Sequence, residues 1–248
     1  MKKQFQILAT TLISIAIVSC SKQAVEKPEA PQRANEEIST SSSSSSSRTV
    51  VDPLTVGLEG WFTFNHNLTD QTKKLKDAVT SLSRAASYTY DRNGISNSAL
   101  KLDSSYYLTI SKVPQQTKTS ISVWLQYGNE VPAIAFLRPT VAGPGIGQQN
   151  KTFLGQINTP LTNTAFSTDQ TKTWHHVVVT YDGSLVRLYI DGSLNATVSE
   201  PGSFGHLFSN YVLGIDPKFE YRWTGYVDDL RFYSRTLTAT DVQKLYNL

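Results

Sequence analysis

The sequence has very little cysteine, since Cys20 is the only one in 248 residues, and this excludes an internal disulfide. It also lacks a long apolar run: Ile7–Val18 is shorter than the roughly 20 residues that a membrane-spanning helix needs. Net charge is low as well. Without Lys2 and Lys3, which we expect to be removed with a leader, 21 basic side chains balance 20 acidic ones. Because no lysine and arginine cluster is present, nucleic-acid binding has little electrostatic support.

The first twenty residues have the pattern of an export signal. Two lysines precede the apolar run Ile7–Val18, which ends in the sequence Ile17-Val18-Ser19-Cys20. This ending resembles the bacterial lipobox, and the resemblance implies cleavage before Cys20 and lipid attachment to its thiol. Ser21 stands where aspartate would favour inner-membrane retention, so similarity to enterobacterial sorting implies the outer membrane. A plain secretory signal is the alternative, although Ile17 fits an ordinary cleavage site poorly.

The composition predicts three segments: a signal peptide over 1–19, a lipid-anchored linker over 20–50, and one folded domain over 51–248. The linker contains seven consecutive serines, Ser41–Ser47, and too little apolar surface to fold. As a flexible coil of about 30 residues it has an expected span of roughly 30 Å. It is interpreted either as a tether that holds the domain away from a membrane or as a spacer without further meaning.

The domain is predicted to be all-β because short runs of alternating or β-branched residues are separated by Gly, Pro, Asn and Asp. In Trp174–Gly192 the pattern is clearest, with Asp182-Gly183 and Asp191-Gly192 as expected hairpin turns. The predicted strands are Gly60–Asn65, Ala99–Leu102, Tyr106–Ile110, Ser120–Gln126, Ala133–Leu137, Thr152–Ile157, His176–Tyr181, Leu185–Ile190, Tyr211–Ile215 and Gly225–Tyr233.

Two further local features follow from residue chemistry. Val141–Gln149 is rich in Gly and Pro and is predicted to be a long loop. Near the C-terminus, Thr238 and Asp241 have the spacing of a capping box, which predicts a helix start. Val242, Leu245 and Tyr246 then share one helix face, which is expected to pack on the sheets.

These segments, in this order, resemble the bacterial laminin-G-like jelly rolls of the concanavalin A-like lectin/glucanase superfamily. The resemblance covers nearly all of residues 57–248 except 126–173, and it implies a two-sheet antiparallel jelly-roll sandwich with one short C-terminal helix. The matching segments are Gly60–Asn65 with Asn67 and Asp70, Ala99–Asp103 with Tyr107-Leu108, Thr119–Trp124, Trp174–Gly192 and Trp223–Leu245.

Catalysis has weak support in the sequence. Related glucanases carry Glu-x-Asp-x-x-Glu, and retaining enzymes need carboxylates about 5 Å apart. None of the domain's four glutamates has this arrangement, and Asp228-Asp229 would face opposite ways unless a bulge intervenes. His175-His176 suits a lyase base, but the resemblance implies a structural role for this pair. We therefore expect no catalytic residues.

A structural calcium ion is a further expectation. The resemblance implies carboxylate ligands at Asp70 and Asp228, with loop carbonyls completing the oxygen shell that this cation prefers. Alternation in 226–233 breaks at Asp228, so a bulge is expected there. Lys73 and Lys74 would be unfavourable beside a cation. The alternative is that Asp228 caps the bulge and that Asp229 pairs with Arg231 or Arg235.

Glycan binding needs exposed aromatic rings, and Phe219, Tyr221 and Tyr106 are the candidate ligand contacts. Packing in the core or at an edge is the alternative for each, and Trp223 is expected to be buried. Any site is expected in the loops 65–77, 141–149 or 216–223.

The sequence thus predicts a non-catalytic outer-membrane lipoprotein that binds a carbohydrate or a protein ligand outside the cell. A structural or adhesive envelope component without a small ligand is the alternative, and a polysaccharide-degrading enzyme is the third hypothesis. No nucleic-acid partner is expected.

Overall fold

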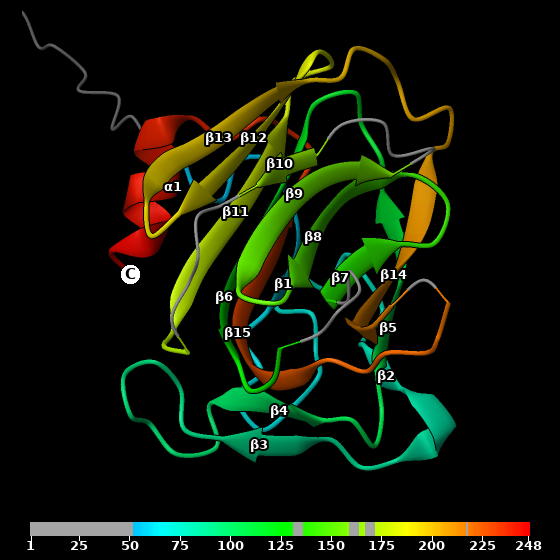
Figure 1. Ribbon diagram of the computed structural model, residues 1–248, viewed down its shortest axis with the longest axis vertical. Coiled ribbons are helices and arrows are strands. Elements are labelled where there is room, and N and C mark those ends of the chain that lie inside the picture. The colour runs from blue at the N-terminus through cyan, green and yellow to red at the C-terminus, as the bar shows by residue number, and fades with distance from the viewer. Residues whose placement is uncertain (1–51, 131–135, 159–163, 167–171, 217) are drawn as a thin grey trace, which may run out of the picture. The chain divides into compact units, whose positions relative to one another are not determined.

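The computed structural model describes residues 52–130, 136–158, 164–166, 172–216 and 218–248. All belong to one compact unit. Figure 1 shows two layers of β-sheet facing each other, with a single α-helix on the outside of one layer. The predicted two-sheet antiparallel sandwich of jelly-roll type with a short C-terminal helix is confirmed.

The first sheet, here called sheet A, has the strand order β13-β12-β11-β6-β15-β4-β3, and β1 also pairs with β15. Every pairing that it contains in the described residues is antiparallel. Its strands are β1 (Leu58–Phe62), β3 (Ser87–Thr89), β4 (Ala99–Asp103), β6 (Thr119–Tyr127), β11 (His175–Tyr181), β12 (Leu185–Ile190), β13 (Ser193–Ser199) and β15 (Thr224–Tyr233).

The second sheet, sheet B, has the order β10-β9-β8-β7-β14-β5-β2 and is also antiparallel in its described pairings. A 3-10 turn, Ser81–Ser83, follows its edge strand β2. Its strands are β2 (Val79–Thr80), β5 (Leu108–Pro114), β7 (Phe136–Pro139), β8 (Gly143–Gln149), β9 (Thr152–Asn158), β10 (Thr164–Phe166) and β14 (Phe208–Ile215).

Strand β11 shows how the alternating sequence produces the packing. Val177, Val179 and Tyr181 point into the core between the sheets, because side chains two apart share a face. Val178 points the other way and joins a second apolar cluster. All seven residues of β11 are buried, so both faces of this central strand are covered.

The cover on the outer face is the helix α1, Ala239–Tyr246. The predicted capping box is confirmed: the Thr238 side chain accepts a hydrogen bond from the Asp241 backbone N–H, and the Asp241 carboxylate accepts one from the Thr238 backbone N–H. Val242 and Leu245 are buried beside Val178 of β11, as their shared helix face predicted. Figure 1 shows this helix beside β11 to β13.

The two predicted turns differ in detail. Asp191-Gly192 joins β12 to β13 with positive φ at both residues, 50° and 78°, as expected for a two-residue hairpin turn. In the first hairpin, Tyr181 pairs with Val186 and the Asp182 N–H bonds to Leu185 O, so the turn is centred on Gly183 and residue 184. The Asp182 carboxylate instead accepts the Leu185 N–H at 2.8 Å.

The prediction that Val141–Gln149 is a loop is wrong for most of this segment, because residues 143–149 form β8 in the middle of sheet B. Its glycines allow close packing: a Cβ at Gly145 would lie 3.2 Å from Leu137 O. The predicted strand Gly60–Asn65 ends at Phe62, and β7 begins at Phe136, whereas residues 133–135 lie outside the described part. Strands β2, β3, β10 and β13 were not predicted.

The leader, the linker and Cys20 lie outside the described residues, so lipidation and the segment boundaries stay predictions. Within the described residues, no helix has both the length and the apolar character needed to cross a membrane.

Candidate ligand-binding site

The expected bulge in β15 is present. Asp228 lies opposite Trp124 of β6, and Arg231 lies opposite Ser122, so β15 has one extra residue between the two pairs. Asp229 has φ of 53°, a left-handed conformation that non-glycine residues seldom adopt. The extra residue keeps Leu230 in the core and places the two adjacent carboxylates next to arginines.

Both carboxylates of the bulge are engaged by cations. Arg92 pairs with Asp228, and its Nη2 lies 3.7 Å from Asp229 Oδ2. Arg231 binds Asp229 through two N–H groups, at 3.2 Å and 3.0 Å, and the Trp61 indole N–H also donates to this carboxylate. The alternative expectation that Asp229 pairs with Arg231 is therefore confirmed.

A cavity of about 340 Å³ opens beside these groups and is lined by Trp61, Asp91, Arg92, Asp228 and Arg231 among others. Burial raises the pKa of Asp228 to about 7, Arg92 opposes the shift, and the charges of Asp229 and Asp91 add to it. A perturbed carboxyl in a cavity is a feature of functional sites. Here the Asp228 carboxylate is already paired with Arg92. The two aspartates and two arginines of the bulge therefore form a structural network on the outside of sheet A.

The other expected calcium ligand, Asp70, has a different environment. Its Oδ1 accepts the N–H groups of Trp61 and Thr72 at 2.8 and 3.1 Å. Its Oδ2 accepts the Thr72 hydroxyl at 2.6 Å and the N–H groups of Lys74 and Leu75 at 3.0 and 2.8 Å. Asp70 is 1% exposed and does not line the cavity beside Asp228.

Asp70 thus organises its own loop with hydrogen bonds. Among the described residues, no group of three or more His, Cys, Asp or Glu side chains is arranged to hold a metal. Calcium binding stays a prediction that these contacts do not support.

The histidine pair is enclosed in the fold. His176 is 1% exposed, its Nε2 lies 2.9 Å from Ser122 Oγ, and its ring lies 5.2 Å from that of Trp124. Burial lowers the pKa of His176 to about 3, so the ring is neutral near pH 7. Asp191 fixes both residues: it bonds His175 Nδ1 at 2.8 Å and accepts the His176 N–H at 2.9 Å. These contacts give the pair a structural role.

The three aromatic candidates separate clearly. Phe219 and Tyr221 are exposed, by 55% and 41%. Tyr106 is only 1% exposed, and its hydroxyl donates to Lys101 O at 2.6 Å and accepts the Ser87 N–H at 3.1 Å. The expectation that Tyr106 contacts a ligand is therefore wrong, because its ring and hydroxyl are both committed to packing. The neighbouring Tyr107 is half-buried.

Phe219 belongs to a surface cluster that the sequence did not reveal. Its ring meets that of Tyr107 edge-on at 5.9 Å, and the Arg138 guanidinium lies 5.3 Å above it. Arg222 lies 5.8 Å from the Tyr107 ring. We call Tyr107, Arg138, Phe219, Tyr221 and Arg222 the aromatic–arginine platform.

Three platform residues, Phe219, Tyr221 and Arg222, lie in the connection from β14 of sheet B to β15 of sheet A. The Asp216 carboxylate accepts the N–H groups of residues 218, 220 and 221 at 3.0, 2.6 and 2.7 Å. Phe219 has φ of 61°, an unfavourable conformation for a bulky residue, and its ring is nevertheless exposed. Strain at an exposed aromatic residue points to a role outside folding.

The two arginines of the platform have unused hydrogen-bonding capacity. Arg138 Nε and one Nη of Arg222 are enclosed and have no partner among the described residues. Burial lowers the pKa of Arg138, whereas Asp216 and Tyr107 oppose this effect. Because these two N–H groups are enclosed, a ligand at the surface would have to meet the remaining donors of the two guanidinium groups, which can bind an acidic or hydroxyl-bearing ligand.

The fold is a lectin-like jelly-roll β-sandwich. The chain belongs to the concanavalin A-like lectin/glucanases superfamily, whose laminin-G-type model matches residues 102–243. The adhesion G-protein coupled receptor V1 of Danio rerio is 26% identical over 104 residues. This covers 39% of the chain and only 2% of the receptor.

Two solved structures are similar in fold. Domain 4 of AbnA, a GH43 extracellular arabinanase from Geobacillus stearothermophilus solved in complex with arabinotriose, has a TM-score of 0.58 at 17% identity, over 76% of this chain and 98% of that domain. The botulinum neurotoxin serotype C1 binding domain has a TM-score of 0.59 at 16% identity, over 77% of this chain and 52% of the other. At these identities the similarity shows the fold alone.

Proposed function

We propose that this protein is a non-catalytic, lipid-anchored module that binds carbohydrate through the aromatic–arginine platform. The exposed, strained Phe219, with its ring against Tyr107 and the Arg138 guanidinium above it, carries the proposal. Aromatic rings offer an apolar surface with an electronegative face, and guanidinium groups donate paired hydrogen bonds. This combination fits the mixed apolar and polar faces of a sugar.

The similar structures support a carbohydrate ligand. The arabinanase domain was solved with arabinotriose, and type C botulinum neurotoxin depends for cell entry on two ganglioside molecules. Each of the two solved structures contains a region similar in fold to this chain, at 17% and 16% identity.

The non-catalytic part of the proposal rests on the contacts of the bulge. A retaining glycosidase needs two available carboxylates about 5 Å apart. Asp229 is held by Arg231 and Trp61, and Asp228 is held by Arg92. His176 is buried and uncharged near neutral pH, so it is a poor base for substrate outside the fold.

Anchoring at the outer membrane, through lipid on Cys20, is proposed from the lipobox-like leader and its following serine. Stable attachment needs more than one acyl chain. The serine-rich segment then acts as a tether that lets the domain reach a ligand away from the bilayer.

The test is a glycan array probed with the full-length chain in detergent, followed by titration of the best ligand. Replacing Phe219 with alanine is expected to weaken binding by about tenfold, since an exposed aromatic contact contributes about 1–1.5 kcal/mol. Tyr90→Ala is the matched control, because Tyr90 is 62% exposed on β3's side of the domain and outside the platform. Absence of binding to every polysaccharide, or equal effects of both variants, would refute the proposal.

A further inference from the structure

A second charged surface lies on the same sheet as the platform. A groove of about 380 Å³ runs between the 71–77 loop and strand β5. Three lysines from two distant parts of the chain line it, and no carboxylate is among its lining residues in the described part of the chain. The lining residues are Lys74, Leu75, Lys76, Ser111, Lys112 and Asn210.

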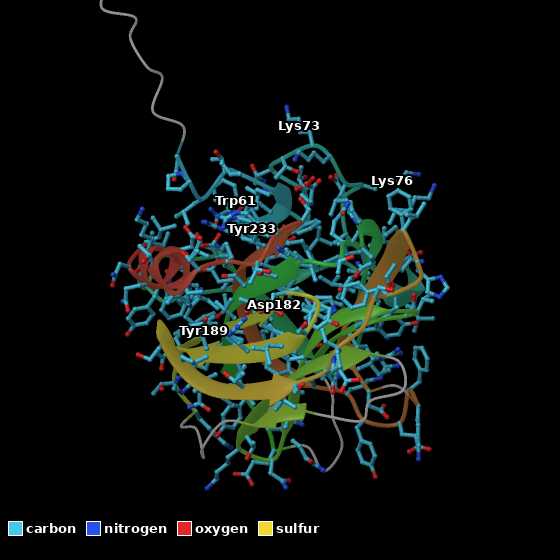
Figure 2. The ribbon with its side chains drawn as sticks, turned by 90° about the horizontal axis from the view of Figure 1, so that it is seen from above. Trp61, Lys73, Lys76, Asp182, Tyr189 and Tyr233 are labelled. Atoms are coloured by element: carbon cyan, nitrogen blue, oxygen red, sulfur yellow. The ribbon has the colours of Figure 1, made fainter. Side chains whose placement is uncertain are left out.

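The loop holds its lysines in place through Asp70. The carboxylate accepts the N–H groups of Lys74 and Leu75, and Leu75 packs against the core, which fixes the chain on either side. Figure 2 shows Lys73 and Lys76 pointing away from the sandwich into solvent. Asp70, which was expected to bind calcium, therefore helps to fix the loop that carries these lysines.

Lys112 is directed into the groove by an irregularity in β5. It has φ of 56°, and its N–H donates to Asn210 Oδ1 at 2.9 Å. The register between β5 and β14 shifts at this point, between Ser209 and Tyr211. Bulges of this kind re-aim a side chain, and here the result is an exposed lysine on the groove wall.

One of the three lysines, Lys74, is ion-paired and also donates a hydrogen bond to Leu58 O, whereas Lys76 and Lys112 have no ion pair among the described residues. Glu59 lies 3.5 Å from Lys74 Nζ, but the Lys74 side chain is still 51% exposed. The nearby Asp77 accepts from the Thr69 hydroxyl at 3.4 Å. The groove is therefore lined by two lysines without a carboxylate partner within the described ranges, which would attract anions, an attraction that salt weakens.

Strand β5 runs from the platform to the groove, because Tyr107 directly precedes it and both Ser111 and Lys112 belong to it. Leu108 and Ile110 are buried, so Tyr107, Thr109 and Ser111 lie on the outer face. Tyr107 belongs to the platform and Ser111 lines the groove. Tyr107 and Lys112 are five steps of chain apart, which is about 17 Å when the strand is fully extended.

We propose that these surfaces form one track for an extended anionic polysaccharide, carrying carboxylate or sulfate groups. This inference rests on the proposed function and names its ligand class. The arginines bind one acidic group with paired hydrogen bonds, whereas the lysines act as point charges on the following groups. The separation of about 17 Å requires a chain rather than a single sugar.

Titrations of the full-length chain with polygalacturonate, dextran sulfate and uncharged dextran test the track, at low and high salt. The acidic polymers are expected to bind and to weaken as salt rises. The variant Lys76→Gln/Lys112→Gln is expected to lose about fivefold to thirtyfold affinity for them, as two exposed charge contacts do. The control is Lys151→Gln/Lys244→Gln, which removes the same charge outside the groove and is expected to change affinity less than twofold.

Binding of a short acidic oligosaccharide provides the second test. Digalacturonate is too short to span the track, so the groove variant should leave its binding unchanged while Phe219→Ala weakens it. If uncharged glycans bind and the groove variant has no effect, the track is refuted while the proposed function stands. If no polysaccharide binds, the proposed function itself fails. Binding to phosphatidylglycerol vesicles that the groove variant abolishes, without binding to acidic polysaccharides, would reassign the groove to a membrane surface and overturn the proposal.

Discussion

The replacement Asp70→Asn is the sharpest test of the 71–77 loop. It keeps the size of the side chain but exchanges one acceptor oxygen for an NH₂ group. Asp70 Oδ1 accepts two N–H groups, and Oδ2 accepts two N–H groups and one hydroxyl. In either orientation of the amide, at least two backbone N–H groups then face a donor.

The magnitude follows from those contacts. Asp70 is 1% exposed, so water cannot replace the lost acceptor. Losing two charge-assisted bonds is expected to lower the free energy of unfolding by about 3 kcal/mol. For a domain of this size, that corresponds to a fall in Tm of about 6–12 °C.

The assay is thermal and urea unfolding of the full-length chain, with Asp77→Asn as control. Asp77 is exposed and accepts a single 3.4 Å bond, so this variant should change stability by less than about 0.5 kcal/mol. Equal effects of the two variants would refute the hydrogen-bonding role of Asp70. This role would also be refuted if EDTA lowers the Tm of the wild type but not that of Asp70→Asn, because Asp70 would then act through a bound cation.

Three further predictions follow from other parts of the chain. Folding raises the pKa of Asp228 from 3.8 to about 7, so the stability that this group contributes is lost as the pH rises towards 7. Folding lowers the pKa of His176 from 6.5 to about 3, so the stability that this group contributes is lost as the pH falls below 6.5. Urea unfolding at pH 4.5 and 6.5 should therefore show that Asp228→Asn is more stable relative to wild type at pH 6.5 than at pH 4.5. His176→Gln should be less stable relative to wild type at pH 6.5 than at pH 4.5. If either variant has the same pH dependence of stability as the wild type, the corresponding pKa shift is contradicted. Thr238→Ala removes the acceptor for the Asp241 N–H and should lower the free energy of unfolding by about 1 kcal/mol, and a change near zero would show that the cap contributes nothing. Cys20→Ser should move the protein from the membrane to the soluble fraction, and continued membrane retention would rule out the lipid anchor.

Most of the strands were predictable from the sequence because their signal is local. In β11, β12 and β15, β-branched and aromatic residues recur; an Asp-Gly pair follows each of β11 and β12, and a capping box marks where the helix begins. Each of these signals depends on residues within a few positions of one another. The bulge at Asp228 was predictable for the same reason, since it is the only way for Val227 and Leu230 to share the core.

Strand β8 shows where local signals fail. Its sequence, GPGIGQQ, has the composition of a loop, yet six of its seven residues are buried. Gly145 lies against Leu137 O of the adjacent strand, and Gln148 Oε1 accepts the indole N–H of the buried Trp223. Neighbouring strands thus create both the need for small residues and the partner for a buried amide, and neither is visible within the segment itself.

The platform and the groove could not be predicted from the sequence for a related reason. Arg138 of β7 and Arg222, which follows β14, become neighbours of Phe219 and Tyr107 only through the order of strands in sheet B. The overall charge likewise concealed the groove, because a nearly neutral chain still brings Lys112 opposite the lysines of the 71–77 loop. A balanced net charge excludes a protein-wide basic field, but it places no limit on a local one. In an antiparallel sandwich, side chains far apart in sequence meet across neighbouring strands, so charge has to be counted over the folded surface.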